Sequence, residues 1–306
     1  MGAFFSLFMN LFPLYLLIAA GYGAVRYLQV DRQSLGTLAI YIFMPLVVFG
    51  FVADMEFQPS YIALPIFFYC VSVIIGLGFF KLGEYVYEDK QKNLMAMLTS
   101  MGNTGYYGLP LVLLFFDKDT VAIYIFMTLG GLVYEATVGY YIAARSSFTV
   151  KESLTKLTRF PVMYAMALGF VVNALDMQLP EIFWTYWTHF KGAYVIAGMM
   201  IIGGALAGLE KFVFGPRLLG LVFLGKFILT PLLSLLFIGF DKMVTQWYGP
   251  DIYNLLIIVA IVPPAANIAA YATQMNIEPE KAATTILIGT VFALFYIPLV
   301  IWLIGL

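Results

Sequence analysis

Ten long apolar runs, separated by short polar connections, most constrain what this 306-residue chain can fold into. Hydrophobic residues make up 62% of the sequence and charged residues only 11%, which leaves too little polar surface to cover a water-soluble globule of this size. A helix needs about 20 apolar residues to cross the hydrocarbon core of a bilayer, and ten such helices use nearly the whole length. The sequence therefore predicts an all-α integral membrane protein whose solvent is the lipid bilayer.

The ten runs fall into two groups of five. The first group is predicted at 3–25, 35–53, 61–80, 94–116 and 120–144, and the second at 161–174, 193–209, 218–239, 252–274 and 282–306. The basic segment 145–160 is predicted to be a short cytoplasmic linker, so the two halves are 1–144 and 161–306. Since each half has an odd number of helices, a second half that repeats the first lies upside down in the bilayer. Such inverted repeats are typical of secondary transporters.

Basic residues are strongly biased toward alternate connections. Twelve Lys and Arg residues fall in one set of connections and three in the other, and the positive-inside rule assigns the richer set to the cytoplasm. A multi-pass protein of the cell (inner) membrane with both termini outside the cytoplasm is predicted. The 16 basic and 17 acidic residues form no basic stripe, which excludes nucleic-acid binding. The single cysteine, Cys70, excludes an intrachain disulfide and a cysteine-rich metal site.

The most helix-hostile stretch of each half lies in its fourth run. Residues 102–110 contain three glycines and a proline, which disfavour a continuous helix by about 1 kcal/mol per Gly and 3 kcal/mol per Pro. Residues 263–267 read Pro-Pro-Ala-Ala-Asn. Unwound backbone at membrane depth is tolerated only where protein buries it or where it lines a watered cavity, so two breaks indicate a binding site. The alternative is that Gly and Pro only kink or closely pack these helices.

The chemistry expected at these breaks suits an anion. After each break, the second half-helix directs its N-terminal amides, which carry about half a positive charge, toward the centre of the membrane. Asn103 and Asn267 add side-chain donors and acceptors. The candidate substrate-binding residues are Asn103, Thr104, Gly105, Tyr106, Tyr107 and Asn267. The sequence leaves open which tyrosine faces the cavity.

Two ionisable residues lie deep in other runs, Glu135 in the fifth and Lys226 in the eighth. Intramembrane charges are expensive, which makes both residues candidates for ion or proton coupling. Glu135 is a candidate to bind and release a proton unless Lys226 pairs with it and holds it ionised. A static ion pair, or a charge that reaches a wet vestibule, is the alternative. No cofactor is expected beyond a coupling H⁺ or Na⁺.

The segment Asn103–Pro110 resembles the N-x-G-F/Y-x-G-x-P signature of the auxin efflux carrier family, and Pro263–Asn267 resembles the second crossover motif of that family. The resemblance implies a fold similar to bile-acid symporters and sodium/proton antiporters, with ten helices, broken crossover helices 4 and 9, and a homodimer. It implies a scaffold of helices 1, 2, 6 and 7 and a moving transport unit of helices 3–5 and 8–10. It matches Asn103 and Asn267 to the crossover asparagines, and it puts Pro110 and Pro264 at the starts of the second half-helices.

The function expected from the residues and the resemblance is secondary active transport of a small organic anion by an elevator-type mechanism, with proton coupling favoured. The family includes plant auxin exporters and prokaryotic carriers of malate or malonate, and the short linker of this chain favours a prokaryotic member. A uniporter or sodium-coupled carrier of the same fold, a channel and a membrane sensor are the alternatives. No enzymatic activity is expected, since the sequence contains neither HExxH nor GxSxG nor a pair of intramembrane aspartates.

Overall fold

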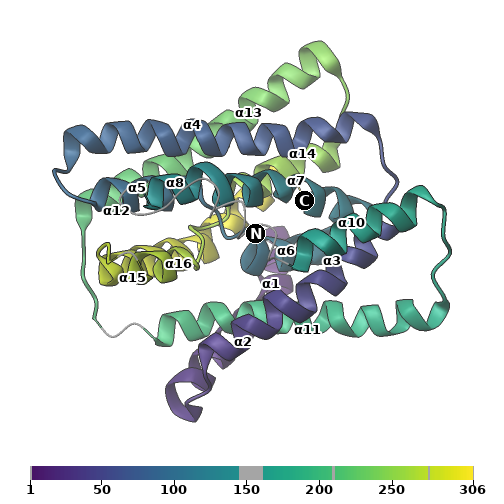
Figure 1. Ribbon diagram of the computed structural model, residues 1–306, viewed down its shortest axis with the longest axis horizontal. Coiled ribbons are helices and arrows are strands. Elements are labelled where there is room, and N and C mark those ends of the chain that lie inside the picture. The colour runs from purple at the N-terminus through teal and green to yellow at the C-terminus, as the bar shows by residue number, and fades with distance from the viewer. Residues whose placement is uncertain (1, 145–160, 209–210, 275, 306) are drawn as a thin grey trace.

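The computed structural model describes residues 2–144, 161–208, 211–274 and 276–305, most of which are helical (Figure 1). The predicted linker 145–160 lies outside the described residues. The long helices are α1 (Gly2–Leu28), α4 (Ala63–Val86), α7 (Lys118–Tyr134), α11 (Glu181–Ala207) and α16 (Pro279–Ile304). The shorter helices are α2 (Arg32–Leu38), α3 (Met44–Ala53), α5 (Gln91–Ser100), α6 (Leu109–Phe115), α8 (Tyr140–Ala144), α10 (Pro161–Ala174), α12 (Pro216–Phe223), α13 (Thr230–Phe240), α14 (Pro250–Ile261) and α15 (Ile268–Gln274).

Each predicted apolar run is largely helical in the described residues. In the part of the chain that the structure describes, seven helical stretches are long and apolar enough to cross a membrane, and three further apolar helices are shorter: Thr104–Phe115, Pro161–Ala174 and Pro250–Ile261. The largest error in a predicted boundary is at α11, which begins at Glu181 and not at residue 193. Trp184 and Trp187 therefore lie within the helix and not in the connection before it. The helix continues through the polar residues His189 and Lys191, because no glycine or proline lies between 181 and 191 to end it.

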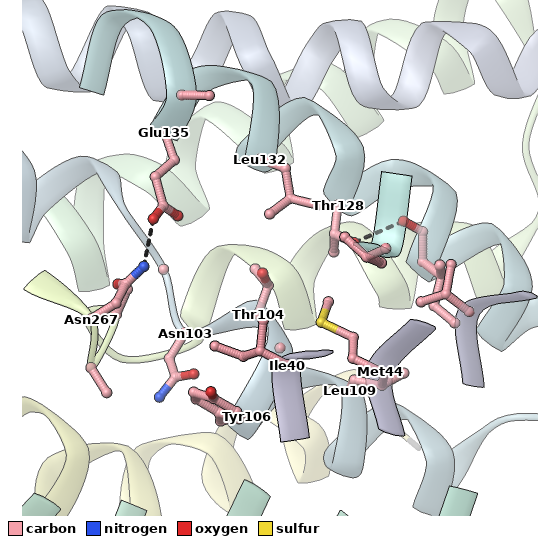
Figure 2. A pocket seen from close by; sticks show the side chains of 18 of the residues that line it. Ile40, Met44, Asn103, Thr104, Tyr106, Leu109, Thr128, Leu132, Glu135 and Asn267 are labelled. Carbon is pink, nitrogen blue, oxygen red and sulfur yellow. Dashed lines mark hydrogen bonds between the residues drawn. The ribbon is translucent and has the colours of Figure 1, made fainter. Parts of the chain in front are cut away.

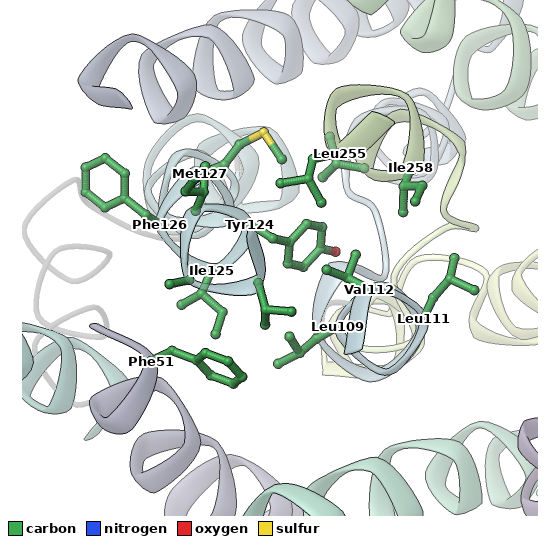
Figure 3. Packing of buried hydrophobic residues seen from close by; sticks show 14 of the residues in the cluster. Phe51, Leu109, Leu111, Val112, Tyr124, Ile125, Phe126, Met127, Leu255 and Ile258 are labelled. Carbon is green, nitrogen blue, oxygen red and sulfur yellow. The ribbon is translucent and has the colours of Figure 1, made fainter. Parts of the chain in front are cut away.

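The helices pack in several layers around a central apolar core. In the view of Figure 1, α4 runs across the upper part of the molecule and α11 across the lower part, with α5 and α7 between them. Helix α1 packs along α11, α3 along α10, and α4 along both α5 and α7. Figure 3 shows Tyr124 and Met127 of α7 packed with Val112 of α6, Phe51 of α3 and Leu255 of α14. All five of these side chains are buried, so this cluster fixes the position of α7 relative to the broken helix that ends in α6.

Three helices contain a π-helical turn directly before a proline. Pro45, Pro110 and Pro231 lack an N–H, and each proline ring would crowd the carbonyl group four residues earlier in a regular α-helix. The residue before each proline donates instead to the carbonyl five positions earlier, which widens the helix. These three bonds run from Met44 to Ala39, from Leu109 to Thr104 and from Thr230 to Gly225. The prolines thus create irregular turns, and two of them contain predicted site residues, Thr104 and Lys226.

A buried carboxylate organises the turn between α13 and α14. Asp241 is 1% exposed, and its oxygens accept four hydrogen bonds. The donors are the Thr245 hydroxyl at 2.5 Å, the Trp247 N–H at 3.0 Å, the Tyr248 N–H at 3.2 Å and the Tyr253 hydroxyl at 2.7 Å. Because all four donors belong to the segment 245–253, Asp241 holds this turn against the start of α14.

Asp241→Asn is expected to lower the stability of the folded protein by about 1–3 kcal/mol. An amide keeps one acceptor oxygen but places an NH₂ group opposite the N–H of Tyr248, which leaves a buried donor unsatisfied. Thermal unfolding of the purified protein in detergent measures the effect. Asp251→Asn, an exposed acidic residue in the first turn of α14, is the matched control and should change the melting temperature little. Equal melting temperatures for Asp241→Asn and Asp251→Asn would contradict this role.

Candidate functional site: two broken helices beside a cavity

The two helix breaks predicted from the sequence meet in space. Helix α5 ends at Ser100, and helical structure resumes at Thr104; α14 ends at Ile261, and α15 begins at Ile268. Gly102 and Pro264 form an isolated antiparallel β-bridge between the two breaks. The N–H of Asn103 donates to the carbonyl of Pro263 at 2.8 Å, and the N–H of Ala265 donates to the carbonyl of Met101 at 3.1 Å. Main-chain hydrogen bonds thus satisfy part of the unwound backbone and hold the two segments together.

A cavity of about 500 Å³ lies beside this bridge. One wall includes the two breaks and the cavity face of α7 with the π turn that follows it, and the other includes residues from α3, the π turn before it, α10 and α11. Figure 2 shows Glu135, Asn267 and Asn103 toward the left of the cavity and Ile40, Met44 and Leu132 farther to the right. The cavity is therefore amphipathic, with a polar end at the helix breaks and an apolar end. Its volume falls in the range of small-molecule sites.

Three polar side chains that line the cavity have unused hydrogen-bonding capacity. Asn103 is 5% exposed, and its side chain makes no hydrogen bond to any described residue. The Oδ1 atom of Asn267 and the hydroxyl of Tyr194 are also buried without a hydrogen-bond partner among the described residues. Buried polar groups are nearly always paired in folded proteins, so the two buried unpaired atoms of Asn267 and Tyr194, with the unpaired amide of Asn103 on the same cavity, mark a place suited to a polar ligand.

Glu135 is the one charged side chain among the described residues that line the cavity. It lies in a π turn, Glu135–Gly139, that continues α7. Its Oε1 accepts hydrogen bonds from Nδ2 of Asn267 at 2.5 Å and from the hydroxyl of Tyr271 at 2.8 Å, and Figure 2 shows Glu135 and Asn267 pointing toward one another. No ion pair joins Glu135 and Lys226 among the described residues, and Lys226 does not line the cavity. Glu135 is held by neutral donors instead.

Backbone donors add to this polar end. The N–H groups of Gly105 and Tyr106, which follow the first break, form no hydrogen bond with another described backbone group. The same is true of the N–H groups of Ala266 and Asn267 in the second break. All four residues line the cavity. Because the first N–H groups of a helix carry partial positive charge, the polar end suits a carboxylate without any cationic side chain.

Not all of the other predicted site residues line the cavity. Thr104, Gly105 and Tyr106 line the cavity, but Tyr107 does not; it is buried on the other side of the helix, among Tyr15, Ile18 and Met199. Consecutive residues of a helix point in different directions, so only one of the two tyrosines faces the ligand space.

The two prolines also differ from one another. Pro110 is the second residue of α6, as the resemblance implied, but it lies outside the cavity lining. Pro264 does not begin a half-helix: it is paired with Gly102 in the bridge, four residues before α15. Pro264 fits the extended backbone at this position. The hydrogen bonds of the bridge are donated by the N–H groups of Asn103 and Ala265, so the missing N–H of Pro264 costs no hydrogen bond.

Comparison with known proteins decides the family. The model of the family described as "Membrane transport protein" matches residues 6–153 and 144–301, which together cover nearly the whole chain. The chain belongs to the membrane transport protein family. This is the auxin efflux carrier family that the segment Asn103–Pro110 resembles, so the predicted family is confirmed. Among relatives, an uncharacterized transporter of Methanocaldococcus jannaschii is 22% identical over 298 residues, which cover 90% of each chain.

The site of this membrane transport protein includes three tyrosines that the sequence reasoning missed. Tyr271 donates to Glu135, Tyr124 donates to the carbonyl of Thr104 at 2.9 Å, and Tyr194 presents its unpaired hydroxyl next to Gly105. One signal pointed to Tyr271: it follows Asn267 by four positions, which places both on one face of a helix. Tyr124 and Tyr194 carry no such local signal, because helices distant in sequence bring them to the cavity.

Proposed function

We propose that this protein is a secondary active transporter that carries a small organic monocarboxylate across the cell membrane together with a proton. The observation that carries the proposal is the amphipathic cavity whose polar end holds Asn103, Asn267 and Glu135 beside two broken helices. Membership of a family of membrane transport proteins supports the transport activity. Unwound helices that meet at a ligand site are a recurrent design of secondary transporters.

The cavity lining favours one charged group on an otherwise apolar substrate. The polar end offers a carboxylate the side-chain N–H groups of Asn103, the Nδ2 hydrogen of Asn267 that Glu135 does not accept, and the free main-chain N–H groups of Gly105 and Ala266. The apolar end is lined by Ile40, Met44, Leu132, Val162 and Met166, which suit a hydrocarbon or aromatic body. A second carboxylate in that end would be desolvated without a partner. A monocarboxylate with an apolar body therefore fits better than a dicarboxylate.

Glu135 supplies the reason for proton coupling. An ionised glutamate beside the binding groups would repel a carboxylate, since no cationic side chain lines the described cavity to compensate. A protonated Glu135 removes this repulsion and adds an O–H donor to the polar end. Binding of the anion and of the proton then favour one another, and the two move together.

The helix packing supports alternating access by two units. We infer that ten helices cross the membrane with both termini outside the cytoplasm, and that helices 1, 2, 6 and 7 of the chain form a dimeric scaffold. The remaining helices then form the transport unit, and the cavity lies between the two units. Away from the cavity, Lys118 at the start of α7 forms an ion pair with Asp54 at the end of α3, and its Nζ lies 3.8 Å from the ring centroid of Trp184 in α11. These contacts join the two proposed units and would break when the units slide.

The test is carboxylate uptake into proteoliposomes as a function of pH. Uptake by the wild type is expected to fall as pH rises, because each pH unit above the pKa of Glu135 lowers its protonated fraction about tenfold. Glu135→Gln keeps a neutral side chain at every pH and is expected to transport with little pH dependence between about pH 5 and about pH 8. Indole-3-acetate, benzoate and malate are suitable labelled substrates, since they differ in apolar body and charge.

Glu84→Gln is the matched control for the pH experiment. Glu84 lies near the end of α4, is exposed and does not line the cavity, so this variant should keep the pH profile of the wild type. Saturable uptake by Glu135→Gln with an unchanged pH profile would refute proton coupling through Glu135. Uptake of none of the three acids by the folded wild type would refute the proposed substrate class.

A further inference from the structure

Lys226 is a buried lysine that the proposed transport cycle does not use. It lies in the π turn Leu224–Leu229 between α12 and α13 and is 1% exposed. Its Nζ lies 2.7 Å from the point that a Cβ atom on Gly102 would occupy, and Cγ2 of Val262 lies 2.9 Å from the same point. The tip of Lys226 therefore reaches the place where the two broken segments meet. Gly102 lines the cavity and Lys226 does not, so the ammonium group lies behind the bridge.

No carboxylate of a described residue pairs with Lys226. The described ion pairs are Lys118 with Asp54 and Lys281 with Glu278, and Glu135 accepts its hydrogen bonds from Asn267 and Tyr271. A buried ammonium group without a counter-charge is expensive, so Lys226 stays charged only where other groups stabilise it. The surroundings of Gly102 are the place to look for them.

The crossing of the two segments is rich in carbonyl groups and poor in donors. Helices α5 and α14 both end there, and the C-terminal end of a helix carries about half a negative charge. Pro263 and Pro264 have no N–H to offer. The carbonyls of Ser100, Val262 and Pro264 accept no hydrogen bond from a described backbone N–H outside the helices. Two helix ends and these three carbonyls together form a field that attracts a cation.

We propose that the ammonium group of Lys226 permanently fills a monovalent-cation position behind the helix crossing, so that this protein needs no sodium. Lys226 is a positioning residue: its charge holds the ends of α5 and α14 beside one another and does not touch the substrate. The consequence for transport rests on the proposed function, whereas the cation position itself does not. A variant that removes the charge and leaves space should bind a small cation in its place.

The experiment measures thermal unfolding of the purified full-length protein in NaCl, LiCl, KCl and choline chloride at equal ionic strength. The wild type is expected to melt at the same temperature in all four salts. Lys226→Ala is expected to melt lower in choline chloride and to recover by at least about 3 °C in NaCl or LiCl, because a cation that binds the folded state raises its stability by mass action. Lys226→Met removes the charge but fills the space, so it should melt lower without recovery.

Lys242→Ala is the matched control, since Lys242 lies at the end of the same helical stretch, is exposed and stands over the ring of Tyr253. It should show no preference among the four salts. Sodium-specific stabilisation of the wild type would overturn the proposal, and this outcome can be measured even if Lys226→Ala fails to fold. A loss of stability in Lys226→Ala that no cation restores would overturn it as well. No substrate is present, so either result is independent of the uptake assay.

Discussion

Asn103→Ala and Asn267→Ala are each expected to lower the initial rate of carboxylate uptake by about 10- to 100-fold. A hydrogen bond to a charged partner contributes about 1.5–3 kcal/mol, which corresponds to this range of rates when the bond to the substrate is lost. Asn267→Ala has a second effect, because it also removes the 2.5 Å hydrogen bond from Nδ2 to Glu135. The larger loss is therefore expected for Asn267→Ala.

Both variants should still fold. The bridge between the two breaks is made by main-chain groups, the N–H of Asn103 to the carbonyl of Pro263 and the N–H of Ala265 to the carbonyl of Met101, and neither bond needs an asparagine side chain. Asn103 makes no side-chain hydrogen bond with described residues that its substitution would break. Melting temperatures close to that of the wild type are expected for the purified variants.

Asn254→Ala provides the matched control for the two uptake variants. Asn254 lies in α14, the helix before the second break, and does not line the cavity. Its substitution should leave uptake near the wild-type rate. Saturable transport at the wild-type rate by both Asn103→Ala and Asn267→Ala would refute the assignment of the substrate site to the helix breaks, whatever substrate is used.

Gly203→Ala is expected to destabilise the protein by about 2 kcal/mol or more. Helices α1 and α11 approach so closely that a Cβ atom on Gly203 would lie 1.8 Å from the carbonyl oxygen of Ile18 and 2.7 Å from the nitrogen of Tyr22. The approach is reciprocal, because a Cβ atom on Gly21 would lie 2.1 Å from the carbonyl oxygen of Met200. Backbone atoms cannot move aside as a side chain can, so the two helices must separate along their length.

The measurement is thermal unfolding in detergent, with Gly192→Ala as the matched control in the same helix. A Cβ atom on Gly192 would meet nothing within 4 Å. Gly192→Ala should therefore keep or slightly raise the melting temperature, since alanine favours a helix by about 1 kcal/mol over glycine. Equal melting temperatures for Gly203→Ala and Gly192→Ala would show that α1 and α11 do not pack closely in the folded protein.

The apolar runs and the helix breakers were readable from the sequence because both depend on local chemistry. Runs of about 20 apolar residues require lipid around them, and the glycines and prolines of 102–110 and 263–267 disfavour a helix wherever they occur. The same local reasoning chose Asn103, Asn267 and Glu135, which the structure brings to one end of one cavity. Motif resemblance added the family, which the comparison confirmed.

Only the tertiary structure decided which partners these residues have. Glu135 bonds to Asn267 and Tyr271 and not to Lys226, because the packing of α7 against the second break sets the neighbours of a side chain, whatever its charge. Tyr106 faces the cavity and Tyr107 faces away, which depends on the rotation of a short irregular helix. Tyr194 reaches the cavity and Lys226 reaches the crossing from helices distant in the sequence. Such contacts arise from the sum of many weak packing interactions that no local pattern records.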